Sequence, residues 1–335
     1  MTTKTQVFFT GATGYIGGSV LARLLDHHTF PFSEITALLR PSQPDRSAAL
    51  HSLGVKTVQG TNSDLEVLER QASQSDAVFS CADSDDLPAC EAILRGLKKR
   101  HETTGTVPVL IHTVSSIFID DMKCNGNYSS EKIWDDMKLD ELDTIPDTNL
   151  HRNVDVPILA ADKEGYVKTY IVHPSAVCGL AKGKLAHVQN TRSAQIPTLI
   201  KASLDRNPVR VGIVGKGENI WPNVHIDDLA ELYMVLYDAI LSGKAGHGRE
   251  GLYFAENGEI VLKSICQKIA QGAKTPCASG STDADENHKL VMIGTNSRCK
   301  GNRARALGWK PRYTIEDMLN TVEEDVKDQL MLRQV

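Results

Sequence analysis

The chain has 335 residues, of which 41% are hydrophobic and 24% charged, and it carries a formal net charge of −5. This length predicts one large α/β domain with an appended lobe, and the mild acidity gives no electrostatic reason to expect nucleic acid or an anionic membrane as a partner. No membrane-spanning apolar run or targeting segment is evident, which predicts a cytoplasmic protein. The 7 cysteines include no C-x-x-C pair, which argues against disulfides and against a metal site.

Short apolar strands alternate with helices through the first half of the chain. The periodicity predicts strands at 7–10, 35–39, 55–59, 77–81, 109–113 and 169–172. It predicts helices between them at 15–26, 64–71, 88–100 and 150–163. This repeated β-α-β order indicates an α/β fold, a doubly wound parallel sheet of the Rossmann type. Beyond residue 174 the pattern is less regular, and we expect helices at 197–204, 228–241, 262–271 and 315–330.

A glycine-rich turn, VFFTGATGYIGGSV at 7–20, joins the first strand to the first helix. Gly11 permits a tight turn, Gly14 leaves room for a pyrophosphate against the backbone, and Gly17 lets the helix approach the sheet. The start of the helix then offers free amides and a partial positive charge to the phosphates. A plain turn needs one glycine, so three at this spacing predict a dinucleotide site.

The segment TGATGYIG resembles the T-G-x-x-G-x-x-G signature of the short-chain dehydrogenase/reductase superfamily, in its extended and atypical branches. Further resemblances follow in the family's order: DAVFSCA (76–82), LIHTVSSIFI (110–119), IVHPSAVCG (171–179), NVHIDDLAELY (223–233) and ALGWKPRYTIEDML (306–319). Together they cover nearly the whole chain, and fungal NmrA-like or epimerase/dehydratase-like proteins are the most similar groups.

The resemblance implies a Rossmann domain over 1–179 and a smaller, mainly substrate-binding lobe over 180–335, with 223–242 returning to the Rossmann core. The expected cofactor-binding residues are Gly11, Thr13, Gly14, Tyr15, Ile16, Gly17, Arg40, Asn62, Ala82, Pro174 and Val177.

The end of the second strand bears on the choice of cofactor. A carboxylate there would bind the ribose 2′-hydroxyl of NAD, whereas an arginine accommodates the 2′-phosphate of NADP. The chain has Leu38-Leu39-Arg40, with Arg46 nearby, so NADP(H) is favoured over NAD(H). The alternative is that Arg40 is only a solvated charge, or stacks on the adenine of either cofactor.

The superfamily reduces carbonyls with a serine, a tyrosine and a lysine four residues after the tyrosine. Ser115 fits the serine position. The helix at 150–163 contains no Tyr-x-x-x-Lys, and His151 and Asp155 have that spacing instead. His151 could serve as the acid and Asp155 could accept hydrogen bonds from ribose hydroxyls. The alternative is a histidine that starts a helix and an exposed aspartate.

A second candidate pair is Tyr128 and Lys132, which have the i,i+4 spacing in the segment YSSEK. If this segment is helical, both side chains share one face. If it is a loop, the spacing is chance.

Three functions remain open on the sequence. The first is an NAD(P)H-dependent oxidoreductase that reduces a small carbonyl compound. The second is an NmrA-like, non-catalytic dinucleotide sensor, favoured by the missing tyrosine and lysine. The third is an epimerase or dehydratase that retains its cofactor. Relatives often form homodimers through the helices at 88–100 and 150–163, but burial of their apolar faces against the sheet explains the same pattern.

Overall fold

The computed structural model describes residues 4–114, 123–279 and 293–333. Seven parallel strands form its central sheet, in the order β11-β7-β5-β4-β1-β2-β3. They are β1 (Thr5–Thr10), β2 (Ser33–Leu39), β3 (Lys56–Gln59), β4 (Ala77–Ser80), β5 (Val109–Thr113), β7 (Lys168–Pro174) and β11 (Leu252–Ala255). The strand order reverses between β1 and β4, and this is the place where open α/β sheets bind ligands.

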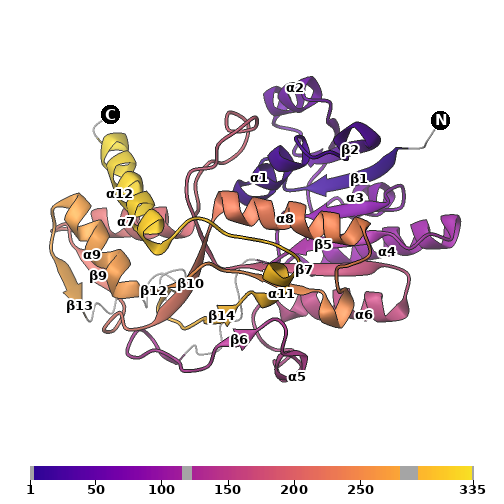
Figure 1. The fold of residues 1–335 in the computed structure, drawn as a ribbon. Coiled ribbons are helices and arrows are strands. Elements are labelled where there is room, and N and C mark those ends of the chain that lie inside the picture. Colours follow the sequence, from indigo (N-terminus) through magenta and orange to yellow (C-terminus); the bar gives the residue numbers. More distant parts are fainter. Residues whose placement is uncertain (1–3, 115–122, 280–292, 334–335) are drawn as a thin grey trace.

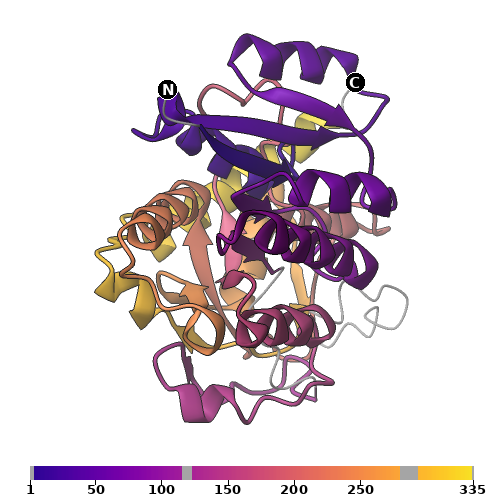
Figure 2. The same cartoon turned by 90° about the vertical axis from the view of Figure 1, so that its right-hand side faces the viewer.

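Helices cover both faces of this sheet (Figures 1 and 2). One face packs on α1 (Tyr15–Leu24), α2 (Pro44–Ser52) and α8 (Ile226–Leu241). The other packs on α3 (Leu65–Ala72), α4 (Leu87–Thr104) and α6 (Arg152–Glu164). Successive strand residues point to opposite faces, so Phe8 lies in the second core and Phe9 in the first.

A second lobe lies beside this domain, at the left of Figure 1. Its core contains α7 (Gln195–Leu204), α9 (Leu262–Ala273) and α12 (Ile315–Leu332), packed on β9 (Val211–Ile213), which pairs with β13 (Cys277–Ser279). A three-stranded sheet of β8 (Ala176–Cys178), β10 (Ile220–His225) and β12 (Glu259–Val261) lies between the lobe and the central sheet.

Smaller elements cover the β11 edge of the central sheet. They are β6 (Trp134–Asp135), α5 (Leu139–Leu142), β14 (Cys299–Lys300) and α11 (Asn302–Ala306), with 3-10 turns at Phe30–Phe32 and Gly248–Glu250. Trp134 and Cys299 pack with Phe254 of β11. None of the described helices is long and apolar enough to cross a membrane.

Each helix and strand expected from the pattern is present, with shifts of a few residues at the ends. The elements that the sequence reading missed include α2 and β11. Because β11 completes the central sheet and Trp309 lies in its core, the return to the Rossmann domain extends well beyond 223–242. The apolar positions of α4 and α6, including Ile93, Leu97 and Ile158, are buried against the sheet.

Candidate functional site

A groove of about 960 Å³ lies at the carboxyl ends of the central strands. The loops after β1, β2, β3 and β4 and the end of β5 form its walls, together with Asn190 from the segment that leads into the second lobe. This is the size of a pocket that takes a large ligand. Among the expected cofactor residues, those on the groove wall are Gly11, Thr13, Gly14, Ile16, Arg40, Asn62 and Ala82.

The glycines of the first loop have distinct structural reasons. Gly11 has a φ of 73°, and a Cβ there would lie 2.3 Å from the carbonyl oxygen of Cys81. A Cβ on Gly17 would lie 2.3 Å from the carbonyl oxygen of Gly11, so this glycine permits close packing of α1 on the strand. Gly14 is the N-cap residue of α1, and no side chain caps the helix. The first amides of α1 are therefore available to an anionic ligand, as the phosphates of a dinucleotide require.

The remaining expected cofactor residues lie off the groove wall. Tyr15 donates a hydrogen bond from its hydroxyl to the carbonyl of Gly179, at 2.6 Å, and thereby ties α1 to the segment after β8. Gly17 has the packing role just described. Pro174 ends β7 and Val177 lies in β8, and neither is among the residues that line the groove.

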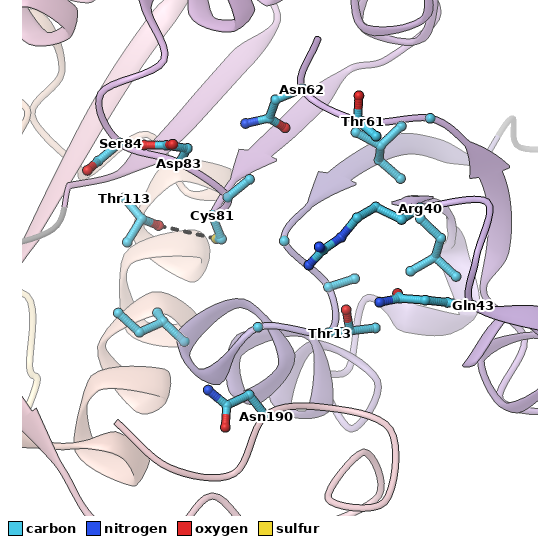
Figure 3. Close-up of a pocket in the computed structure, with 18 of the residues that line it drawn as sticks. Thr13, Arg40, Gln43, Thr61, Asn62, Cys81, Asp83, Ser84, Thr113 and Asn190 are labelled. Atoms are coloured by element: carbon cyan, nitrogen blue, oxygen red, sulfur yellow. Dashed lines mark hydrogen bonds between the residues drawn. The ribbon is translucent and has the colours of Figure 1, made fainter. Parts of the chain in front are cut away.

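One end of the groove, beside β2, is rich in guanidinium groups. Arg40 and Arg46 both line it, with Gln43 between them in sequence. Figure 3 shows Arg40 extending from the end of β2 toward the centre of the groove, with Gln43 on the same side. Neither arginine forms an ion pair with any residue in the described part of the chain. This end can therefore bind a phosphate through planar donor groups.

The groove floor is fixed by a buried hydrogen-bond chain. The Thr113 hydroxyl lies 3.2 Å from the Cys81 sulfur (Figure 3) and 2.6 Å from the Tyr233 hydroxyl of α8. Burial raises the pKa of the Cys81 thiol to about 12, so it stays protonated and unreactive at neutral pH. These groups join α8 to the sheet beneath the groove.

At the other end, Asp85 lines the groove and contacts His151, the residue expected to act as an acid. His151 Nδ1 lies 2.5 Å from Asp85 Oδ1. The imidazole is only 7% exposed, whereas the Asp85 side chain is 49% exposed. His151 Nε2 is buried and has no hydrogen-bond partner within the described residues. His112, also near His151, has its pKa lowered to about 4, chiefly by burial and then by the charge of His151, so it is neutral.

His151 adopts a left-handed backbone conformation, with φ 70°, at the N-cap of α6. This conformation costs a residue other than glycine about 1–2 kcal/mol. Its carbonyl accepts the first hydrogen bonds of α6, from the amides of Val154 at 3.0 Å and Asp155 at 3.2 Å. The strained residue is therefore held in place by the helix that it starts.

Asp155 does not reach the groove. Its carboxylate is 1% exposed, and one oxygen lies 4.0 Å from Nε2 of His173, which is equally buried. Neither carboxylate oxygen has a hydrogen-bond partner among the described residues. The expectation that Asp155 binds ribose hydroxyls is therefore wrong for this structure, and so is the alternative of an exposed aspartate.

Of the two alternatives for Tyr128 and Lys132, the loop applies, because residues 128–132 have no helical structure. The Tyr128 side chain is exposed, and Lys132 pairs with Glu141 at 2.8 Å and lies over the ring of Trp134. The i,i+4 spacing therefore gives these two residues no common face. Ser115, the expected serine, lies outside the described residues.

Gln43, Asp85 and Asn190 are among the groove residues that the sequence reading did not predict. Gln43 precedes α2, which was itself missed. Asn190 reaches the groove because its backbone amide donates a hydrogen bond to the carbonyl of Thr13, at 2.9 Å. The two residues lie far apart in the sequence. For Gln43 and Asp85 the sequence did hold a signal, since each follows a strand of the parallel sheet by a few residues.

One group of side chains has the composition of a metal site, although no metal was expected. His27, His28 and Asp238 lie together at the ends of α1 and α8. Ion pairs between the imidazoles and Asp238, at 3.2 and 3.8 Å, account for this arrangement.

Comparison with known proteins gives a consistent picture. Residues 3–136 match the model of the NmrA-like family. The chain is 31% identical to "Oxidase ucsJ" of Acremonium sp. over 335 residues, covering 91% of this chain and 92% of that one. It is 26% identical to an uncharacterised Saccharomyces cerevisiae protein, YLL056C, with 93% and 97% coverage.

Two solved structures share the fold at low sequence identity. A UDP-glucose 4-epimerase from Thermotoga maritima, solved with UDP-glucose, has a TM-score of 0.65 at 14% identity and covers 97% of this chain and 100% of its own. A dTDP-glucose 4,6-dehydratase from Bacillus anthracis, solved with NAD, has a TM-score of 0.63 at 13% identity, with 97% coverage of both chains.

Proposed function

Because this chain belongs to the NmrA-like branch of the extended short-chain dehydrogenase/reductase family, we propose that it is an NADP(H)-dependent oxidoreductase that reduces a small carbonyl compound. The family and the fold support a nicotinamide dinucleotide as cofactor and NAD(P)-dependent oxidoreduction as the class of chemistry. The preference for NADP(H) and the reduction of a carbonyl are our proposals.

The observation that carries the proposal is the composition of the groove. Uncapped amides of α1 lie at its middle, and Arg40 and Arg46 lie on the β2 side of the glycine loop, where we expect the adenosine half of a dinucleotide. The residue directly after β2 is Arg40 and not an aspartate or glutamate. This position therefore offers no carboxylate to accept hydrogen bonds from a ribose diol. Two guanidinium groups at this point favour a 2′-phosphate.

The remaining steps concern the substrate. When bound, the nicotinamide supplies a hydride to the carbonyl carbon, and the carbonyl oxygen then needs one proton to become an alcohol. We assign that proton to His151 rather than Tyr128, because His151 contacts a residue of the groove wall and Tyr128 lacks an aligned lysine. Ser115 is the expected hydrogen-bond donor to the same oxygen.

Isothermal titration calorimetry with NAD⁺, NADH, NADP⁺ and NADPH tests which dinucleotide the protein prefers. We expect NADPH to bind at least tenfold more tightly than NADH, and Arg40→Ala with Arg46→Ala to abolish this difference by weakening NADPH alone. Arg210→Ala, an exposed arginine away from the groove, is the control. Equal affinities for NADPH and NADH in the wild type would contradict the proposal.

Turnover is tested by loss of NADPH absorbance with a panel of aldehydes and ketones. We expect Ser115→Ala and His151→Ala each to lower kcat by at least a hundredfold. Unchanged turnover in either variant would contradict the role assigned to that residue.

A dinucleotide sensor is the second candidate, because α6 does not carry the Tyr-x-x-x-Lys pair of the family's reductases. A sensor would bind the cofactor tightly and would consume none of it with any carbonyl compound. It would bind a partner protein only when the bound cofactor is in one of its two redox states. Pull-down experiments with NADP⁺ and with NADPH would separate the two functions.

A further inference from the structure

We propose that Asp85 is the carboxylate that binds the sugar hydroxyls on the nicotinamide half of the dinucleotide, and that His151 is the residue that positions it. This inference rests on the proposed function for the presence of a dinucleotide. It assigns a role to a groove residue that the sequence motifs did not identify.

The position of Asp85 follows from the order of the strands. The sheet runs β5-β4-β1-β2 across the groove, so the loops after β2 and β4 lie on opposite sides of the glycine loop. Arg40 and Arg46 follow β2, and Asp85 follows β4. A dinucleotide with its pyrophosphate at α1 and its adenosine at Arg40 therefore extends its other half toward Asp85.

The carboxylate of Asp85 has one oxygen engaged and one available. Oδ1 is 2.5 Å from His151 Nδ1, while no hydrogen bond from a described residue reaches Oδ2. The backbone is fixed as well, since the Asp85 amide donates to Asp83 Oδ1 at 3.0 Å and its carbonyl accepts from Asn153 Nδ2 at 3.3 Å. A half-exposed carboxylate held in this way can accept hydrogen bonds from a vicinal diol.

His151 is suited to the positioning role because it cannot easily move. Its ring is buried, its backbone is held in the left-handed region, and its carbonyl receives the first hydrogen bonds of α6. Such strain persists where the surrounding structure holds it. The imidazole therefore presents Nδ1 to Asp85 from a fixed place.

The rest of the groove leaves Asp85 as the best acceptor at this end. No lysine is among the residues that line the groove, so an ammonium group is not available for the sugar. Asp155, the acceptor expected from the sequence, is buried beside His173. Asp83 also lines the groove and accepts the amide of Asp85, but no side chain among the described residues holds its carboxylate, whereas His151 holds that of Asp85.

Two ligands of different length give a sharp test: NADPH, and 2′,5′-ADP, which contains only the adenosine half with its 2′-phosphate. We expect Asp85→Ala to weaken NADPH at least tenfold and to change 2′,5′-ADP by less than twofold. Arg40→Ala should weaken both ligands, because it acts on the shared half. Asp45→Asn, an exposed aspartate on α2 outside the groove wall, should change neither.

The positioning role of His151 is tested by a pair of variants. His151→Leu removes the donor and should reproduce most of the loss for NADPH. His151→Asn retains an N–H donor in a residue that tolerates the left-handed region, and it should recover binding at least partly.

The outcomes separate this inference from the proposed function. If the wild type binds neither ligand, both fail. If the wild type binds both and Asp85→Ala binds NADPH equally well, or loses both ligands alike, only the present inference is overturned. If His151→Leu and His151→Asn lose the same affinity for NADPH while both still bind 2′,5′-ADP normally, the positioning role is overturned.

Discussion

Asp155, which lies outside the groove, illustrates what burial does to a single ionisable residue. Loss of hydration raises the pKa of its carboxyl to about 7, and the charge of Asp85 adds to the rise while Arg152 opposes it. In the unfolded chain the same group titrates near 3.8. The folded protein therefore keeps a proton on Asp155 that the unfolded chain has already released.

The sign of the resulting pH dependence follows from linkage. Between about pH 4 and pH 7 the folded state binds more protons than the unfolded state, so this group lowers the free energy of unfolding as the pH rises. The destabilisation is absent below pH 4 and constant above pH 7. The Asp155→Asn variant lacks this destabilisation. We therefore expect its free energy of unfolding, relative to that of the wild type, to increase by roughly 2–3 kcal/mol from pH 5 to pH 8.

Urea denaturation of the wild type and of Asp155→Asn at the two pH values measures this difference. The exposed Asp45→Asn is the control and should show no such change. A stability difference for Asp155→Asn that is the same at pH 5 and pH 8 would contradict the raised pKa.

At this scale the sequence predicted residues whose role is local and missed those whose role depends on distant contacts. The glycine motif predicted that Gly11 and Gly14 lie beside the groove. The position of Arg40 directly after the second strand predicted the same for that residue. The contact of Asp85 with His151 spans 66 residues, and it requires a left-handed conformation that no pattern predicted. Hydrophobic spacing gave no means of distinguishing a buried Asp155 from an exposed one.

At the scale of elements, the β1–α1 turn combines two requirements that substitutions can separate. Gly14 has an ordinary φ of −76°, and a Cβ there would lie 3.2 Å from its nearest neighbour, the Gly11 carbonyl oxygen. A Cβ on Gly17 would lie far closer to that same oxygen, at 2.3 Å, and 3.0 Å from the Cys81 side chain. The absence of a side chain at Gly14 keeps the groove open, and its absence at Gly17 keeps α1 close to the strand.

We therefore expect Gly14→Ala to change the free energy of unfolding by less than about 1 kcal/mol and to weaken NADPH at least tenfold, because the methyl group enters the phosphate site. Gly17→Ala should cost about 2 kcal/mol or more, because α1 must move away from the sheet. Thermal unfolding and isothermal titration of both variants check this. A stable Gly17→Ala protein with a normal melting temperature would refute the packing argument.

The elements of the first half were predictable because each strand is a short apolar run and each helix has one apolar face. The two missed elements differ in this respect, because α2 lacks such a signal and β11 has one. Only Leu50 of α2 is fully buried, so its pattern is largely polar. In β11 the run of four buried residues is a clear strand, but nothing in the pattern indicates that it joins a sheet whose other strands all lie before residue 175.

The whole molecule is held together by segments that cross between the domain and the lobe. Trp309 donates from its indole nitrogen to the Asp228 carbonyl at 2.8 Å, and Asp228 Oδ2 accepts the amides of Arg312 and Tyr313. The chain thus enters the lobe, returns to the sheet as β11, and passes through the Rossmann core again before α12. We infer that the two parts cannot unfold independently.

Tryptophan fluorescence tests this, because Trp134, Trp221 and Trp309 lie in different apolar clusters. In variants that retain one tryptophan each, with phenylalanine at the other positions, we expect the fluorescence midpoint in urea to coincide with the midpoint by circular dichroism. NADPH at a hundred times its Kd should stabilise every variant by about 2.7 kcal/mol. A separate, earlier transition reported by Trp221 would show that the lobe unfolds alone.

Asn190 joins the lobe to the cofactor loop, and this link makes their ligands interdependent. The neighbouring Arg192 pairs with Asp325 and Asp328 of α12, while the Asn190 amide holds the Thr13 carbonyl. We therefore expect a compound that binds the lobe and shifts α12 to change the affinity for a dinucleotide in the groove. By reciprocity, a bound dinucleotide would change the affinity for that compound by the same factor.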